Sequence, residues 1–231
     1  MFNIETDYLN FVYVIVFMMR VSLILVFLVL VLNTYPQQST LSKGVNYLSE
    51  FIASDYFINL KKTCNDLELT DTLFLRAVKY KNYNYSEALL ALTFATVPYK
   101  EVPIEFPLIG VLDYPLVSAN DSVFLKKDKN LPKKLFYDTP NDNFGDKDKL
   151  AHFFGSAFIS YSSNIFDLGD LIGYFVEVFE QSFKVQSSID TRDLRTNKLG
   201  NIFGDILKKN KNALPSQVML IKSLSYFGYN L

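Results

Sequence analysis

The sequence of 231 residues contains very little cysteine, histidine or net charge. Its single cysteine, Cys64, excludes an internal disulfide and any zinc cluster built from cysteines. The formal net charge at pH 7 is −1 and no nucleic-acid-binding motif is present, so nucleic acid is not an expected partner. The sequence also lacks a nucleophile elbow, a phosphate-binding loop and an HExxH zinc motif, so no familiar hydrolase or nucleotide-binding signature is present.

The N-terminal segment is a long hydrophobic run. Residues 11–32 are apolar apart from Arg20 and one serine, and a helix of that length is roughly 33 Å long, enough to cross a bilayer core. If translation began at the methionines just before Arg20, residues 21–32 would be the hydrophobic region of a signal peptide. We expect residues 1–35 to be a signal anchor or signal peptide, and the protein to lie in a membrane or on the periplasmic or exported side of a bacterial-type envelope. A buried core helix is the alternative.

The middle of the chain divides into a helical region and a proline-rich connector. Apolar spacing and capping residues predict helices over residues 41–62, 70–80 and 86–96. Prolines then recur through residues 98–145 too often for a continuous helix, which predicts an irregular connector with short extended pieces. Within it, the lysine-rich residues 126–134 are expected to form a solvated loop, with anionic lipid headgroups as an alternative contact.

The C-terminal third shows the strongest helical pattern. Its spacing predicts three helices, at about residues 146–165, 168–183 and 191–209. Two of them contain glycines four residues apart, Gly169/Gly173 and Gly200/Gly204, which allow helix backbones to approach closely. The predicted fold is therefore mainly α-helical, with a membrane or signal segment at 1–35, a helical region at 36–97, a connector at 98–145 and a three-helix module at 146–231.

Polar residues recur on each of these three helices. Asp148 and His152 lie four residues apart on the first helix, Glu177 lies on the second, and Asp193 and Asn197 lie four apart on the third. Packing of the helices would bring these side chains together. A carboxylate beside an imidazole can orient it, shift its pKa or share a metal ion with it.

These residues define the candidate sites. His152, Asp148 and Glu177 are the candidate catalytic residues, and His152, Glu177 and Asp193 are the candidate metal ligands, with no particular cofactor indicated. Asn197 and the four glycines are expected to act in packing. The alternative for the whole cluster is a hydrogen-bond network that only stabilises the fold.

The same residues carry a resemblance. The string Asp148-Lys149-Leu150-Ala151-His152-Phe153 resembles the D-K-x-x-H-F opening of the VanZ-like membrane proteins and the YfiM-type envelope proteins. Glu177 matches the glutamate on the next helix of that pattern. A D-x-x-x-N-x-x-G-x-x-x-G helix is matched by Asp193, Asn197, Gly200 and Gly204.

The resemblance covers about residues 145–210 and implies a small helical envelope protein. The VanZ-like members are linked to glycopeptide tolerance without an established reaction. The helices of this chain are less hydrophobic than VanZ spans, so the peripheral YfiM-type protein is the closer match.

Three functions follow from these expectations. The first is a non-enzymatic envelope protein that organises or protects the cell surface through its C-terminal module. The second is a membrane-associated hydrolase or transferase acting on a lipid or cell-wall intermediate, with His152 as acid or base, Asp148 orienting it, and Glu177 and Asp193 holding a cation or headgroup. The third is an accessory subunit whose glycine stripes pack against partner membrane helices. Membrane lipid is an expected partner in all three.

Overall fold

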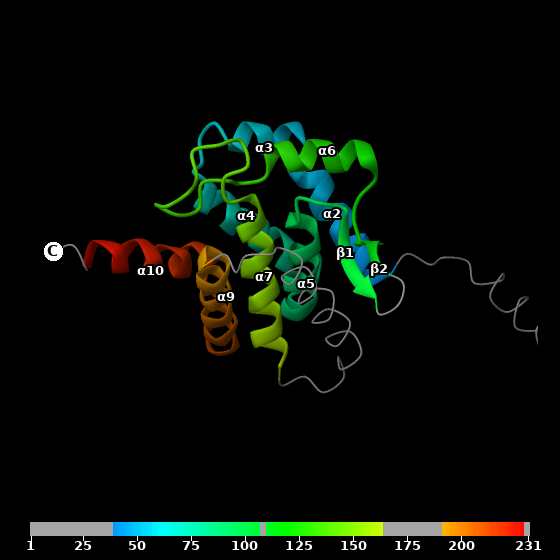
Figure 1. The fold of residues 1–231 in the computed structure, drawn as a ribbon. Coiled ribbons are helices and arrows are strands. Elements are labelled where there is room, and N and C mark those ends of the chain that lie inside the picture. The colour runs from blue at the N-terminus through cyan, green and yellow to red at the C-terminus, as the bar shows by residue number, and fades with distance from the viewer. Residues whose placement is uncertain (1–38, 107–109, 164–190, 229–231) are drawn as a thin grey trace, which may run out of the picture. The chain divides into compact units, whose positions relative to one another are not determined.

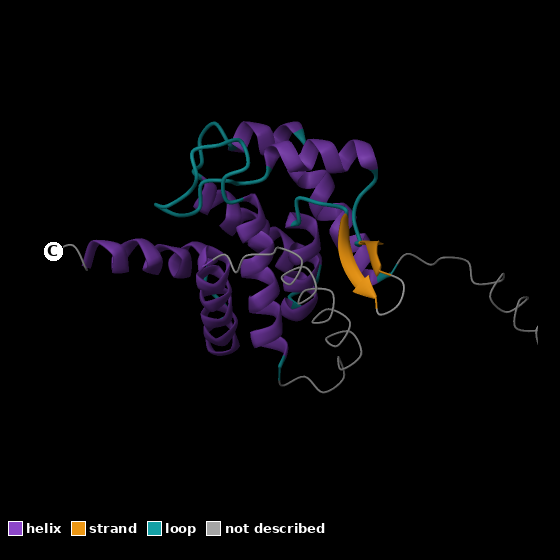
Figure 2. Cartoon of the chain, viewed as in Figure 1, coloured by secondary structure: helices purple, strands orange, loops and turns teal. Residues whose placement is uncertain are grey.

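The computed structural model describes residues 39–106, 110–163 and 191–228. Within these ranges the chain is mainly helical, as the sequence predicts, with a single two-stranded sheet (Figures 1 and 2). The helices are α2 (Thr40–Ala53), α3 (Asp55–Leu60), α4 (Asp66–Tyr80), α5 (Tyr85–Thr96), α6 (Asp121–Asn130), α7 (Lys147–Ser162), α9 (Thr191–Lys209) and α10 (Pro215–Gly228). The strands are β1 (Glu101–Phe106) and β2 (Gly110–Pro115). The apolar run at 11–32 and the helix predicted at 168–183 lie outside the described residues.

Side-chain caps decide where the first helices begin. The single helix predicted over 41–62 is two helices, because the Ser54 hydroxyl accepts a hydrogen bond of 3.2 Å from the Phe57 amide and starts α3. Helix α4 begins earlier than the predicted residue 70. Asn65 accepts from the Glu68 amide at 3.0 Å while the Glu68 carboxylate accepts from the Asn65 amide at 2.8 Å, which is a complete capping box.

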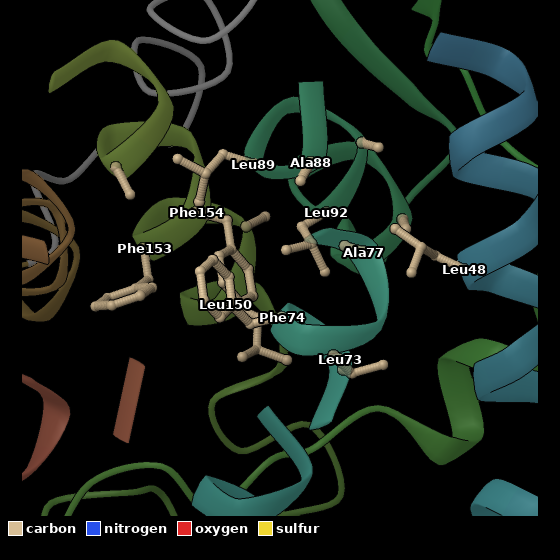
Figure 3. Packing of buried hydrophobic residues seen from close by; sticks show 14 of the residues in the cluster. Leu48, Leu73, Phe74, Ala77, Ala88, Leu89, Leu92, Leu150, Phe153 and Phe154 are labelled. Atoms are coloured by element: carbon tan, nitrogen blue, oxygen red, sulfur yellow. The ribbon is translucent and has the colours of Figure 1, made fainter. Parts of the chain in front are cut away.

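Helix α5 is the centre of the core. Ten of its twelve residues are buried, and it packs against α7, α2 and α4. Figure 3 shows Leu89 and Leu92 of α5 near Phe74 of α4 and Phe154 of α7. Each such side chain contributes about 1.5–3 kcal/mol when it is fully buried. Helix α7 packs directly against this buried helix, so the core fixes the position of α7.

The region predicted to be an irregular connector contains ordered structure. Strands β1 and β2 pair as an antiparallel hairpin, with Glu101 opposite Pro115 and Phe106 opposite Gly110. Helix α6 covers most of the lysine-rich stretch predicted to be a solvated loop, and Lys127 is buried there. Leu131 and Leu135 join the same hydrophobic core as α5 and α7. The parts of the chain predicted as 36–97, 98–145 and 146–231 therefore share one core.

None of the described helices is both long enough and apolar enough to cross a membrane. The predicted membrane attachment through residues 11–32 stays a prediction, because that segment is not among the described residues.

Candidate functional site

The candidate site lies where α9 packs against α7, and two glycines of α9 make that approach possible. A methyl group on Gly200 would lie 2.9 Å from the Ser156 Cβ and closer still to the carbonyl oxygen of Phe153. One on Gly204 would lie 2.5 Å from the carbonyl oxygen of Ala157. These distances are too short for any side chain, so glycine is required at both positions. Gly169 and Gly173 lie outside the described residues.

Polar side chains pair along this crossing. Ser156 donates a hydrogen bond of 3.1 Å to the Oδ1 atom of Asn197, and Ser160 donates one of 2.8 Å to the Oδ1 atom of Asp205. Higher residue numbers on α7 pair with higher numbers on α9, so the two helices run parallel. Figure 1 shows them side by side, with α5 on the other side of α7. The polar stripes that the sequence places on these helices therefore face each other.

At one end of the crossing four charged or titratable side chains form a buried cluster: Asp148, Lys149, His152 and Asp193. The Lys149 ammonium donates to the Oδ2 atom of Asp148 at 2.9 Å and also to the Asp193 carboxylate. The Nε2 atom of His152 lies 3.5 Å from the Oδ1 atom of Asp193. None of the four residues is more than 8% exposed, so the ion pairs are formed out of contact with bulk water.

Burial sets the protonation of the histidine. Desolvation lowers the pKa of His152 below its usual value, and the Lys149 charge acts in the same direction. The Asp193 and Asp148 charges and a hydrogen bond with Asn197 oppose that shift without reversing it. His152 is therefore a neutral imidazole at pH 7, with the lone pair that a base or a metal ligand needs.

Tyr99, between α5 and β1, lies in the electric field of the same cluster. Burial, together with the Asp148 and Asp193 charges, raises the pKa of its hydroxyl to about 12. The phenol therefore stays protonated at all physiological pH values.

The cluster has the donor atoms of a metal site. One ligand atom each from Asp148, His152 and Asp193 lie within 4.8 Å of one another. Two carboxylate oxygens and an imidazole nitrogen suit Zn²⁺ or Mn²⁺. The Oδ1 atom of Asp148 is buried and has no hydrogen-bond partner among the residues that the structure describes. A carboxylate oxygen left in that state favours a cation as a ligand.

The sequence-predicted residues meet only in part. Asp148, His152 and Asp193 come together, and Asn197 bridges to Ser156 beside them. Glu177, predicted both as a catalytic residue and as a metal ligand, lies outside the described residues.

The sequence pattern does not point to Lys149 as part of the cluster, or to Tyr99 as a residue that its charges affect. Lys149 follows Asp148 directly, and its long side chain reaches a carboxylate on another helix. Tyr99 comes from a distant part of the chain, and no spacing rule links it to α7.

Comparison of the chain with known protein families, with characterised proteins and with solved structures finds no match.

Proposed function

We propose that this protein is a membrane-attached envelope protein that binds a divalent cation in the α7–α9 cluster and organises or protects the cell surface without catalysing a reaction. The observation that carries the proposal is the gathering of Asp148, His152 and Asp193 ligand atoms within 4.8 Å, all buried, on two helices fixed by glycine contacts. The apolar run at 11–32 and the VanZ-like and YfiM-type pattern support the envelope location.

The charges of the cluster explain why its ligand would be a cation. Its described residues hold two carboxylates, one ammonium and a neutral imidazole, so negative charge is in excess. Lys149 lies between the carboxylates, in the position that a metal ion would take. A divalent ion that displaced the Lys149 ammonium would neutralise both carboxylates and gain the imidazole as a third ligand. The cluster would then exist in a lysine-filled and a metal-filled state.

A metal titration tests the cation site. Full-length protein in mild detergent would be stripped with a chelator and titrated with Zn²⁺ and with Mn²⁺ by calorimetry. We expect one ion per chain, and a loss of affinity of roughly tenfold or more in His152→Gln and Asp193→Asn, since each removes a direct ligand. Asp205→Asn, which changes an exposed acid on the same helix, is the matched control and should bind normally. Absence of binding by either ion would leave the cluster as a structural hydrogen-bond network.

The envelope location is tested separately. Membranes from cells that express the natural protein would be washed with alkaline carbonate, and the intact mass of each fraction measured. A full-length species retained in the membrane supports a signal anchor, and a species released after shortening to near residue 35 supports an exported peripheral protein. A full-length species in the soluble fraction would contradict envelope location while leaving the cation site standing.

A hydrolase or transferase is the second candidate, favoured by the lowered pKa of His152. A neutral imidazole beside Asp193 has the protonation state of a general base. A His152→Gln variant that keeps its fold and its cation but loses turnover of a lipid or cell-wall substrate would favour the enzyme. The third candidate, an accessory subunit, predicts co-purification with a partner at fixed stoichiometry.

A further inference from the structure

A second polar feature lies on another part of the molecule, at a hollow formed by α2, the start of α3 and α4. Its volume is about 540 Å³. The residues that line it are Tyr47, Glu50, Phe51, Ser54, Tyr56 and Arg76. None of them belongs to the α7–α9 cluster, so this hollow is independent of the proposed cation site.

Arg76 is held in place by aromatic rings instead of by acceptors. Its guanidinium carbon lies 3.9 Å from the ring centre of Phe51 and 5.3 Å from that of Tyr47. Tyr47 in turn stacks on Tyr80, with ring centres 3.9 Å apart and planes inclined by 12°. The rings therefore hold the guanidinium in position.

Among the residues that the structure describes, none accepts a hydrogen bond from Arg76. Its Nε atom is buried and has no hydrogen-bond partner, and among the described residues the side chain forms no hydrogen bond or ion pair at all. A buried donor without an acceptor costs about 1–3 kcal/mol, so the unsatisfied Nε–H of Arg76 does not stabilise the fold. A planar group of five N–H donors held in this position matches the oxygens of a carboxylate or phosphate.

Glu50 supplies the opposite charge in the same hollow. Its carboxylate is exposed and makes no ion pair with Arg76 or with any other residue that the structure describes. Both charges line one hollow and form no direct ion pair across it, so a ligand that carries both signs can contact each of them. The exposed ring of Tyr56 adds a further surface that attracts an ammonium group.

We propose that this hollow binds a small zwitterion, with its carboxylate or phosphate on Arg76 and its ammonium group at Glu50. The hydrocarbon between the two charges would lie over the exposed ring of Tyr56. Two sources offer this chemistry: a free amino-acid-like molecule, or the phosphoethanolamine headgroup of a membrane lipid.

Binding of soluble O-phosphoethanolamine to full-length protein in mild detergent tests the proposal. Inorganic phosphate and ethanolamine, each of which carries charge of one sign only, are the comparison probes. We expect phosphoethanolamine to bind about tenfold or more tightly than either, because only it meets both charges. Equal affinities for phosphate and phosphoethanolamine, or no binding of either, would overturn the proposal.

Substitutions test whether Arg76 binds the anionic group of the ligand and Glu50 its ammonium group. Arg76→Gln should abolish binding, and Arg76→Lys should restore only part of it, because lysine keeps the charge without the planar fork. Glu50→Gln should reduce phosphoethanolamine binding to the level of phosphate. Lys79→Gln, an exposed lysine on the same helix, is the matched control. Binding that survives Arg76→Gln in a folded protein, verified by thermal unfolding, would contradict the assignment.

Lipid nanodiscs distinguish the two sources. Discs containing phosphatidylethanolamine should compete with the soluble probe if the natural ligand is the headgroup. Discs of phosphatidylglycerol, which has the phosphate without an ammonium group, should not. Binding of the soluble probe without competition from either disc would assign the hollow to a free zwitterion. The metal titration of the α7–α9 cluster does not involve these residues, so either proposal can fail alone.

Discussion

The carboxylate of Asp146, which is fully buried, forms an ion pair with the guanidinium of Arg192. The other oxygen of Asp146 accepts hydrogen bonds from the amides of Leu135 and Phe136, at 3.1 and 3.2 Å. Asp146 thus joins the segment before α7 to the first turn of α9. Because Arg192 precedes Asp193, this ion pair also fixes the end of α9 that carries the candidate site.

Replacing Asp146 with Ala should therefore be strongly destabilising. The change removes the buried carboxylate that pairs with Arg192 and that accepts from the amides of Leu135 and Phe136. Removing one partner of a buried ion pair costs about 3–5 kcal/mol. Asp138→Ala is a matched control, because Asp138 contacts the same guanidinium at 3.3 Å from a more exposed position. We expect a loss of about 1 kcal/mol or less there. The free energy of unfolding in urea measures both, and equal losses would contradict a special role for Asp146.

The glycine contacts lead to a second prediction. Gly200→Ala places a methyl group against the Phe153 carbonyl, which cannot move without shifting α7. We expect a loss of about 1–3 kcal/mol, the usual cost of overpacking, together with weaker cation binding. Asn201→Ala, at the adjacent exposed position of α9, should be nearly neutral. A stable Gly200→Ala protein would show that α9 can move away from α7, contrary to this packing.

Local patterns predict the helices well because their signals are local. The ends of α5 and α9 follow from apolar spacing, and the predicted ends at Thr96 and Lys209 match those observed. Helix α4 starts before the predicted residue 70 because Asn65 and Glu68 cap it reciprocally. The sequence contains this pairing, but the prediction did not use it. The hairpin and α6 were harder to predict, since the frequent prolines there exclude long helices without excluding short elements.

Part of the candidate site can be predicted from the sequence for the same reason. Asp148 with His152, and Asp193 with Asn197, lie four apart, so each pair shares a helix face. Lys149 is adjacent to Asp148 and reaches Asp193 only because the glycines bring α9 close. Contacts between distant segments depend on how helices pack, and spacing along one helix does not determine that.

Lys149 itself gives a test of the two-state cluster. Lys149→Met removes the ammonium between the Asp148 and Asp193 carboxylates, so the metal-free protein should lose about 3–5 kcal/mol of stability. With no lysine to displace, Zn²⁺ or Mn²⁺ should bind more tightly than in the natural protein. At a hundred times its dissociation constant the ion should restore about 2.7 kcal/mol.

Thermal unfolding with and without the ion measures this rescue. Lys147→Met is the control, because Lys147 pairs with Asp128 at 3.0 Å, outside the cluster. An ion that rescues both variants equally, or neither, would show that it does not bind between the Asp148 and Asp193 carboxylates.

Lys127 makes the stability of the fold depend on pH. Its amine donates hydrogen bonds to the carbonyls of Ala95, at 3.0 Å, and Val97. Burial lowers its pKa to about 7, and this shift exceeds the opposing attraction of Asp128. A neutral amine still has two N–H groups, enough for both carbonyls.

The sign of the pH dependence follows from the lowered pKa. Between pH 7 and lysine's usual value of 10.5 the unfolded chain holds a proton at Lys127 that the folded protein lacks. The free energy of unfolding should therefore rise with pH in this window, by up to about 1.4 kcal/mol per unit from this residue. Below pH 7 both states are protonated, so Lys127 adds no slope there. Urea unfolding at pH 7, 8 and 9 should show the rise in the natural protein and in Lys126→Met, an exposed neighbour, but not in Lys127→Met. An equal slope in all three would mean that Lys127 keeps its proton in the folded state.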